Sequence, residues 1–133
     1  MQEIGSTITT IPGVSTILGA IILSEIGDVS RFNSPNKLAA FAGIDPSIKQ
    51  SGDYSSIRNH MSKRGSPYLR RALWMACTTS IQFDPMFKEY YLKKRSEGKS
   101  YMTTLGHISK KLITVIFAIL RDNKKYEPVI TAA

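Results

Sequence analysis

The chain has a single cysteine and comparatively few acidic residues. One cysteine excludes an internal disulfide, and the apolar helical pattern around Cys77 is more typical of a small core residue than of a reactive thiol. Ten acidic residues stand against eighteen basic ones, a formal net charge of +8. The acids are scattered, and His60 and His107 have no ligand partners at metal spacing, so we expect no metal site in this chain.

The chain also lacks an apolar run of about 18 residues and an N-terminal basic region followed by an apolar core, so we expect neither a membrane span nor a signal peptide. Its 42% of hydrophobic residues can form a packed interior, and its length indicates one domain over residues 1–133, or two small subdomains that share a core. The single cysteine fits a protein of the reducing cytoplasm. The pI near 9.7 predicts an acidic partner, first nucleic acid and second an anionic membrane. The cations do not line one face of an amphipathic helix, which disfavours the membrane.

Capping signals predict an all-α fold, a compact helical domain. Three dipeptides place an oxygen acceptor at the N-cap and a proline at the next position: Ser34-Pro35, Ser66-Pro67 and Asp84-Pro85. Helical periodicity follows each, and the cations of residues 93–95 complement the dipole of the third helix. A long final helix is expected from about Tyr101 to Asp122, so that helices fill residues 66–123.

The N-terminal residues 11–27, IPGVSTILGAIILSEIG, predict a turn at Pro12-Gly13 and a helix from Val14 to Ile26. Five apolar side chains of this helix are expected to point inward: Ile17, Leu18, Ile21, Ile22 and Ile26. With a short helix at about 2–9, the unit 2–27 is similar to a helix–hairpin–helix, whose hairpin amides bind a DNA phosphate. Gly13 would let the backbone approach the phosphate closely. An ordinary helical turn explains the same residues equally well.

Residues 49–71, KQSGDYSSIRNHMSKRGSPYLRR, form the most basic window of the chain. Against one acid stand six cations, a net charge of +5: Lys49, Arg58, Lys63, Arg64, Arg70 and Arg71. The segment 44–65 has no helical periodicity, and a long loop in a compact domain is usually functional or disordered. Its charge predicts a surface that faces phosphates, with a solvated face as the alternative.

Hydroxyl groups in this window are candidate nucleophiles. Ser51 precedes Gly52, which permits an unusual backbone turn, although several other serines compete: Ser47, Ser55, Ser56, Ser62 and Ser66. For Ser66 the capping role is favoured. Its helix N-terminus, with Lys63, Arg64, Arg70 and Arg71 around it, predicts a phosphate clamp. Elsewhere, Tyr90 and Tyr91 are more typical of packing than of base stacking, and His107 of a partly buried helix residue.

The order of the motifs IPGVSTILGAIILSEIGDVSRF, SPNKLAAFAGIDP, KQSG, SKRGSPYLRRAL and DPMFKEYYLKKRSEGKSY covers nearly all of residues 11–128. This succession resembles the C-terminal domain of the insertion-sequence transposases and Piv-like DNA invertases, whose N-terminal domain is RuvC-like with a DEDD acid set. The resemblance implies site-specific recombination of mobile DNA, in some members guided by an element-encoded bridge RNA. It also implies that a serine of this domain attacks the scissile phosphate.

Carried over by motif, the nucleophile is Ser51, with Ser62 as second choice, and the SKRG and LRR residues contact DNA or RNA. Arg58, Lys63 and Arg64 would offset charge on the phosphate oxygens. The resemblance places Mg²⁺ in the RuvC-like domain, no cofactor in this chain, and a homo-oligomer in the full-length protein. It implies a bacterial or archaeal, nucleoid-associated protein.

The DEDD domain does not precede this sequence, so we expect a shortened or remnant form that binds nucleic acid weakly and does not recombine DNA alone. Two other functions stay open. One is a non-catalytic helix–hairpin–helix module that grips phosphate backbones, and the other is a protein–protein scaffold. The recombinase and the helix–hairpin–helix module both predict nucleic-acid binding with a steep salt dependence, so a binding assay cannot separate them. A trapped covalent serine–DNA species would.

Overall fold

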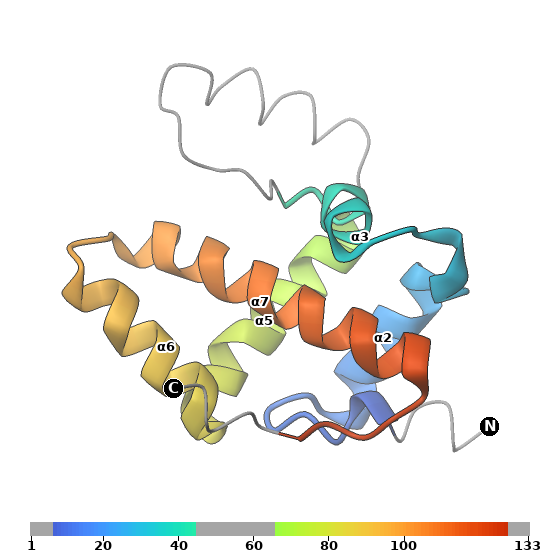
Figure 1. Cartoon of the computed structure of the whole chain (residues 1–133), viewed down its shortest axis with the longest axis horizontal. Helices are drawn as coiled ribbons and strands as arrows, with labels where there is room; N and C mark the ends of the chain where they lie inside the picture. Colours follow the sequence, from blue (N-terminus) through green and yellow to red (C-terminus); the bar gives the residue numbers. More distant parts are fainter. Residues whose placement is uncertain (1–6, 45–65, 128–133) are drawn as a thin grey trace.

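The computed structural model describes residues 7–44 and 66–127, and every regular element among them is helical, as Figure 1 shows. The predicted all-α class is therefore confirmed. The elements follow in the order α2 (Thr16–Ile26), the 3-10 helix η1 (Val29–Arg31), α3 (Pro35–Phe41), α5 (Pro67–Phe83), α6 (Pro85–Ser96) and α7 (Tyr101–Asp122).

All three predicted helix starts are correct, but one cap works differently. The Ser34 hydroxyl accepts from the amide of Lys37 at 3.4 Å, and Ser66 caps α5 in the same way. Asp84 occupies the N-cap position of α6 without a side-chain cap bond. Its Oδ2 instead accepts from the hydroxyl of Tyr126 at 2.5 Å. Because this partner lies 42 residues away in the chain, no local pattern could indicate it.

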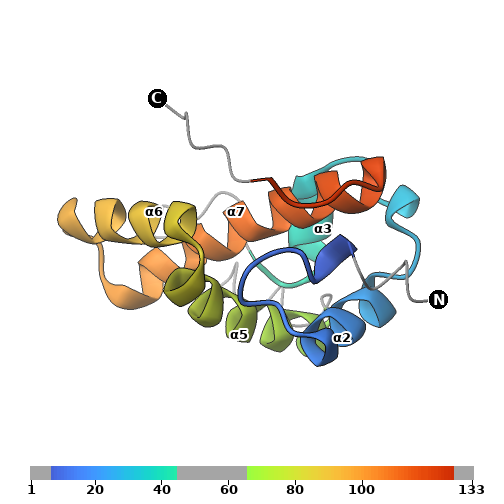
Figure 2. The ribbon, with the colours of Figure 1, turned by 90° about the horizontal axis from the view of Figure 1, so that it is seen from below.

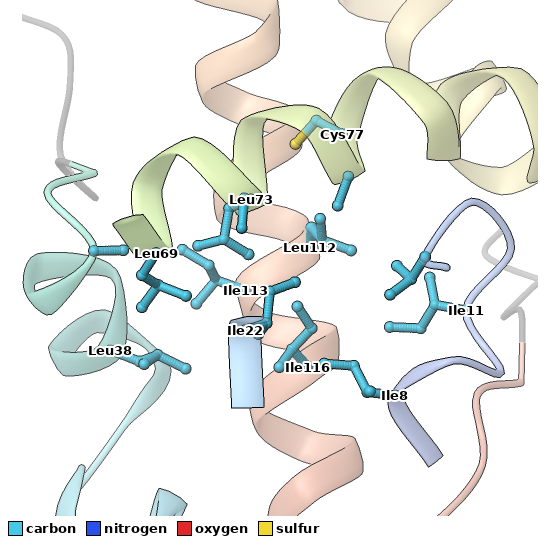
Figure 3. Close-up of a cluster of buried hydrophobic side chains, with 14 of the residues drawn as sticks. Ile8, Ile11, Ile22, Leu38, Leu69, Leu73, Cys77, Leu112, Ile113 and Ile116 are labelled. Atoms are coloured by element: carbon cyan, nitrogen blue, oxygen red, sulfur yellow. The ribbon is translucent and has the colours of Figure 1, made fainter. Parts of the chain in front are cut away.

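Helix α7 forms the centre of the core and contacts α3, α5 and α6, while α2 packs on α5. Figure 2 shows α5 and α2 on one side of the molecule and α7 with α3 on the other. Figure 3 shows the side chains that fill the space between them: Ile8, Ile11, Ile22, Leu38, Leu69, Leu73, Cys77, Leu112, Ile113 and Ile116.

By length and hydropathy alone, α7 could cross a membrane, because its 22 residues include an 18-residue window of mean hydropathy 1.3. The expectation of no membrane span rested on the absence of an unbroken apolar run. In this fold 56% of that window is buried, and its apolar stripe packs on three neighbouring helices. We therefore describe α7 as the core helix.

Helix α2 differs from its prediction in its start and in two of its side chains. It begins at Thr16, because the hydroxyl of Ser15 accepts from the amide of Leu18 and caps it. Ile17 is 73% exposed and Ile21 is 39% exposed, so the prediction that both point inward was wrong. The helix is apolar on almost every side, but the fold covers only the face that carries its other buried residues.

Ser66, where the described chain resumes after Ile44, lies beside the end of α3. The amide of Ser66 donates to the carbonyl of Phe41 at 2.7 Å, which ties the start of α5 to the end of α3. The predicted basic loop 44–65 lies outside the described residues except for Ile44. The structure defines only the two residues that flank this segment, Ile44 and Ser66, at the end of α3.

Candidate nucleic-acid interface

The N-terminus of α5 is held by a buried serine with two hydrogen bonds. The Oγ of Ser66 accepts from the amide of Leu69 at 3.1 Å and donates to Oε1 of Glu25 at 2.7 Å. Both the donor and the acceptor capacity of this hydroxyl are therefore used within the fold. The capping role of Ser66 is confirmed, and the residue is not a free nucleophile in this arrangement.

The acid at this helix end changes the electrostatics of the predicted phosphate clamp. Glu25 belongs to the last turn of α2, and its carboxylate lies at the positive end of the α5 dipole. A phosphate at the same helix end would lie next to a negative charge. The predicted phosphate contact would therefore depend on the cations around the helix end more than on its free amides.

The two arginines of the clamp differ in their surroundings. The guanidinium of Arg70 lies against Gly43, where an added Cβ would be 2.6 Å from its Nη1. Gly43 has φ +78°, so a residue without a side chain both permits the turn and leaves room for the guanidinium. Arg71, in contrast, is exposed. Of the two, Arg71 is the one that solvent and a ligand can reach freely.

Because Gly13 has no side chain, the turn at this residue can pack directly against α5. It has φ +97°, and a Cβ there would lie 2.6 Å from the backbone nitrogen of Ser80 on α5. The hydroxyl of Thr79 donates to the carbonyl of Gly13 at 2.6 Å, and that of Ser80 donates to the carbonyl of Pro12 at 3.0 Å. The close approach that the sequence suggested is thus made to a helix backbone, while phosphate binding by the turn stays a prediction.

The structure does not bring all the predicted contacts to one place. The turn at Gly13 meets α5 ten residues beyond Arg70, a separation of about 15 Å along the helix. The other predicted site residues lie outside the described residues: Ser51, Ser62, Lys49, Arg58, Lys63 and Arg64. Their roles stay predictions, and their segment is anchored beside Arg70 and Arg71.

A shallow hollow of about 430 Å³ lies between η1 and α3, on the same helix that leads into this segment. Its lining combines aromatic rings with cations, and the guanidinium of Arg31 lies 4.8 Å from the ring centre of Phe32 and 4.9 Å from that of Phe41. Lys37 is a second cation of the lining. Aromatic rings beside cations are the groups on which single-stranded bases stack.

A second basic surface lies on the antiparallel hairpin of α6 and α7, and the sequence analysis did not assign it a function. The ammonium groups of Lys94 and Lys111 lie 5.4 Å and 4.8 Å from the ring centre of Tyr90. Tyr90 itself packs partly against the core, as predicted. We define the hairpin surface by six residues: Tyr90, Lys94, Lys99, His107, Lys110 and Lys111.

The pKa of His107 responds to the positive charges of this surface. It is partly buried, as predicted, and burial lowers its pKa below the ordinary value of 6.5. Three neighbouring cations lower the pKa further: Lys94, Lys99 and Lys110. The carboxylate of Glu97 raises it. The signal that could have revealed the surface is the pair Lys110-Lys111, which helical spacing places on the same stretch of α7 as His107.

The described part of the chain offers little for other chemistry. Among residues 7–44 and 66–127, no three His, Cys, Asp or Glu side chains lie together as a metal site would require. Cys77 is fully buried, its Sγ is 3.1 Å from the Oγ of Ser109, and burial raises the pKa of its thiol to about 12. The prediction of a small core residue is confirmed.

Comparison with known proteins assigns the chain to one family. Residues 5–92 match the family model of the IS116/IS110/IS902 transposases. The chain is 33% identical over 127 residues to a 43.6 kDa insertion element IS110 protein of Streptomyces coelicolor, covering 95% of this chain and 31% of that protein. It is 35% identical to a 42 kDa IS900 protein of Mycobacterium paratuberculosis, with 95% and 32% covered. It is 32% identical to the pilin gene-inverting protein of Moraxella bovis, with 92% and 38% covered. The chain therefore spans about a third of the length of these relatives.

Proposed function

Because the chain belongs to the IS116/IS110/IS902 family of transposases, we propose that it is a nucleic-acid-binding and serine-bearing part of a DNA recombinase. The family match and relatives named as pilin gene-inverting proteins support the recombinase class. The charge of the described residues supports nucleic acid as the partner. Fourteen lysines and arginines stand against seven acids there, a net charge of +7.

We propose further that residues 1–133 act as one C-terminal domain of a longer, DEDD-type protein. In this organisation the helices form a scaffold, and the segment 44–65 carries the reacting serine. The acid cluster that a magnesium ion needs is not found among the described residues, so we assign this ion to the RuvC-like domain. As a DNA-acting protein it would work in the cytoplasm, at the nucleoid.

The proposed reaction is a transesterification at phosphorus. The Oγ of Ser51 forms a new bond to a DNA phosphorus while the bond from that phosphorus to the sugar oxygen of the leaving strand breaks. The serine proton is given up, and the leaving oxygen takes up a proton to become a hydroxyl. One phosphate ester replaces another, so the reverse step can rejoin the strand without an energy source. Arg58, Lys63 and Arg64 would offset charge on the non-bridging oxygens.

The observation that carries this proposal is the anchoring of the segment that holds Ser51. Its two ends meet at the hydrogen bond between Ser66 and Phe41, and the adjoining cations of α5 include the exposed Arg71. Seven peptide units join Ser51 to Ile44, so the chain length limits the distance of this serine from the anchor to about 25 Å. Ser62, the second choice, is four positions from Ser66 in the sequence.

DNA is the proposed partner, and a guide RNA is a second polyanion that the same cations could hold. Joining two DNA ends requires two copies of the reacting serine, so the full-length protein is proposed to act as a homo-oligomer. The 133-residue chain alone is expected to bind DNA and not to transfer strands. The rival function is a non-catalytic module that only grips phosphate backbones.

The test uses a full-length protein that contains this domain, stalled on nicked DNA. We expect a covalent protein–DNA adduct whose modified side chain, located by mass spectrometry, is Ser51. Ser51→Ala should abolish the adduct and leave DNA binding largely unchanged, while the matched variant Ser55→Ala should keep both. An adduct that persists in Ser51→Ala and disappears in Ser62→Ala would move the nucleophile to Ser62. No adduct in any variant would favour the non-catalytic module.

A further inference from the structure

We propose that the hairpin surface of α6 and α7 is a second nucleic-acid-binding site, which holds a phosphate backbone apart from the serine-bearing segment. This inference relies on the family assignment for the identity of the polyanion. It does not depend on which serine reacts, or on whether any serine reacts.

The charge of the hairpin equals that of the basic window found in the sequence. Seven cations and two acids fall between residues 88 and 111, a net charge of +5. Lys94 pairs with Glu97 at 3.6 Å, and both groups stay accessible to water. A surface ion pair of this kind contributes little and exchanges readily for a phosphate. The hairpin therefore carries as much net charge as the window 49–71.

The folding of the hairpin concentrates these charges. Lys94 comes from the last turn of α6, Lys99 from the turn, and Lys110 from the middle of α7, yet each of the three lowers the pKa of His107. Like charges held together repel one another, and a bound polyanion relieves that repulsion. The convergence of three separate parts of the chain favours one shared ligand over independent solvated lysines.

Tyr90 keeps two of the ammonium groups in place. Its ring packs partly against the core, and the groups of Lys94 and Lys111 lie over it from two different helices. Cation–π contacts restrict lysine side chains that would otherwise sample many rotamers. Less conformational entropy is then lost when they bind phosphate oxygens. These two lysines are 17 positions apart in the sequence, so only the fold brings them together.

The turn end of the hairpin surface lies away from the anchor of the serine-bearing segment. Figures 1 and 2 both show the turn between α6 and α7, which carries Lys99, at the end of the molecule away from α3, although α7 itself contacts α3. The start of α5, with Arg70 and Arg71, is tied to α3. One chain can therefore contact phosphate backbones at two places, which suits a reaction that must hold more than one strand or duplex.

An anionic membrane is the competing occupant, because Leu92 and Met102 are exposed on the same hairpin. Nucleic acid is favoured because the lysines surround an aromatic ring instead of flanking an apolar stripe that could enter a bilayer. The family match also supplies DNA as the available polyanion. The two occupants give opposite results in the experiment below.

The test measures binding of the 133-residue chain to a fluorescent 30-base-pair duplex by anisotropy over a series of KCl concentrations. Each lost phosphate contact lowers the salt slope by about 0.9, so Lys94→Gln with Lys111→Gln should lower it by about 1.8 and weaken binding about 60-fold at 0.1 M salt. The matched control, Lys124→Gln with Lys125→Gln, removes the same charge beyond the far end of α7 and should have a much smaller effect. Lys94→Arg with Lys111→Arg should restore binding.

Equal weakening in the hairpin and control variants would overturn the proposal, because it would show a response to net charge alone. Binding of the unaltered chain to vesicles of anionic phospholipid, without binding to the duplex, would also overturn it. A measurement on the unaltered protein avoids any folding defect: the duplex should protect Lys94, Lys99 and Lys111 from acetylation, detected by mass spectrometry, and should not protect Lys124. A hairpin variant that binds normally would reject this site and leave the proposed serine chemistry untouched.

Discussion

The bond between Tyr126 and Asp84 allows the sharpest prediction about stability. Asp84 is 1% exposed, its Oδ1 has no hydrogen-bond partner among the described residues, and its Oδ2 accepts from the Tyr126 hydroxyl at 2.5 Å. Tyr126→Phe keeps the ring that stacks on Phe87 and removes only the hydroxyl. A buried carboxylate without any partner is then left behind, which costs about 2–3 kcal/mol.

This loss should be visible in thermal unfolding. For 133 residues the entropy of unfolding is about 0.28 kcal/mol/K, so the expected fall in Tm is about 7–10 °C. The matched control is Tyr101→Phe, because that ring is 47% exposed and its hydroxyl has no hydrogen-bond partner in the described part of the chain. The control should change Tm by a degree or two at most.

A double-mutant cycle separates the carboxylate effect from simple repacking. Asp84→Asn should destabilise the unaltered protein more than it destabilises Tyr126→Phe, because in the second background it removes a charge that has lost its partner. Equal costs in the two backgrounds, or a Tyr126→Phe variant as stable as the Tyr101→Phe control, would refute the reasoning.

The same bond predicts the response to alkaline pH. Burial, and then the hydrogen bond to Asp84, raise the pKa of Tyr126 above its ordinary value of 10.0. Above pH 10 the unfolded chain loses this proton while the folded chain keeps it, so the free energy of unfolding falls as the pH rises. Tyr126→Phe should therefore show a shallower loss of stability between pH 10 and 11 in urea titrations.

Three further predictions concern the anchors of the fold and the hairpin surface. Gly13→Ala should cost at least 2 kcal/mol more than Gly98→Ala in urea unfolding, roughly the cost of a backbone clash, since both have positive φ but only Gly13 lies against α5; equal costs would contradict the packing. Ser66→Ala should cost about 1–2 kcal/mol, because it removes the α5 cap and the partner of Glu25; a neutral effect would show that water replaces both bonds. His107 should titrate below pH 6.5 by NMR and shift upward when duplex DNA is added; an unchanged titration with bound DNA would place the DNA elsewhere.

Local signals in the sequence predicted the helices well. The dipeptides at Ser34 and Ser66 marked helix starts because a cap and a proline act within one turn, where the sequence neighbours are also the spatial neighbours. Cys77 was placed in the core by the same periodicity. These features depend on contacts within a few residues, and such contacts are encoded locally.

Contacts between distant residues could not be predicted in this way. Asp84 was assigned to a cap, but its partner comes from the chain after α7. Ile17 and Ile21 were expected inside because α2 is apolar on almost every side, and only the position of its neighbours decides which side is covered. The hairpin surface arises because α6 and α7 run back along each other, which brings Lys94 and Lys111 to one ring.

The bond that joins Ser66 to Phe41 holds the two residues that flank 45–65 at one corner of the scaffold. Because both ends of this stretch are fixed at the same corner, its length can change without moving a helix. Doubling the length of a flexible insert costs only about 0.6 kcal/mol in chain entropy. Grafting the corresponding stretch from a relative between Ile44 and Ser66 should therefore leave the helices of the described residues intact, which thermal unfolding can check.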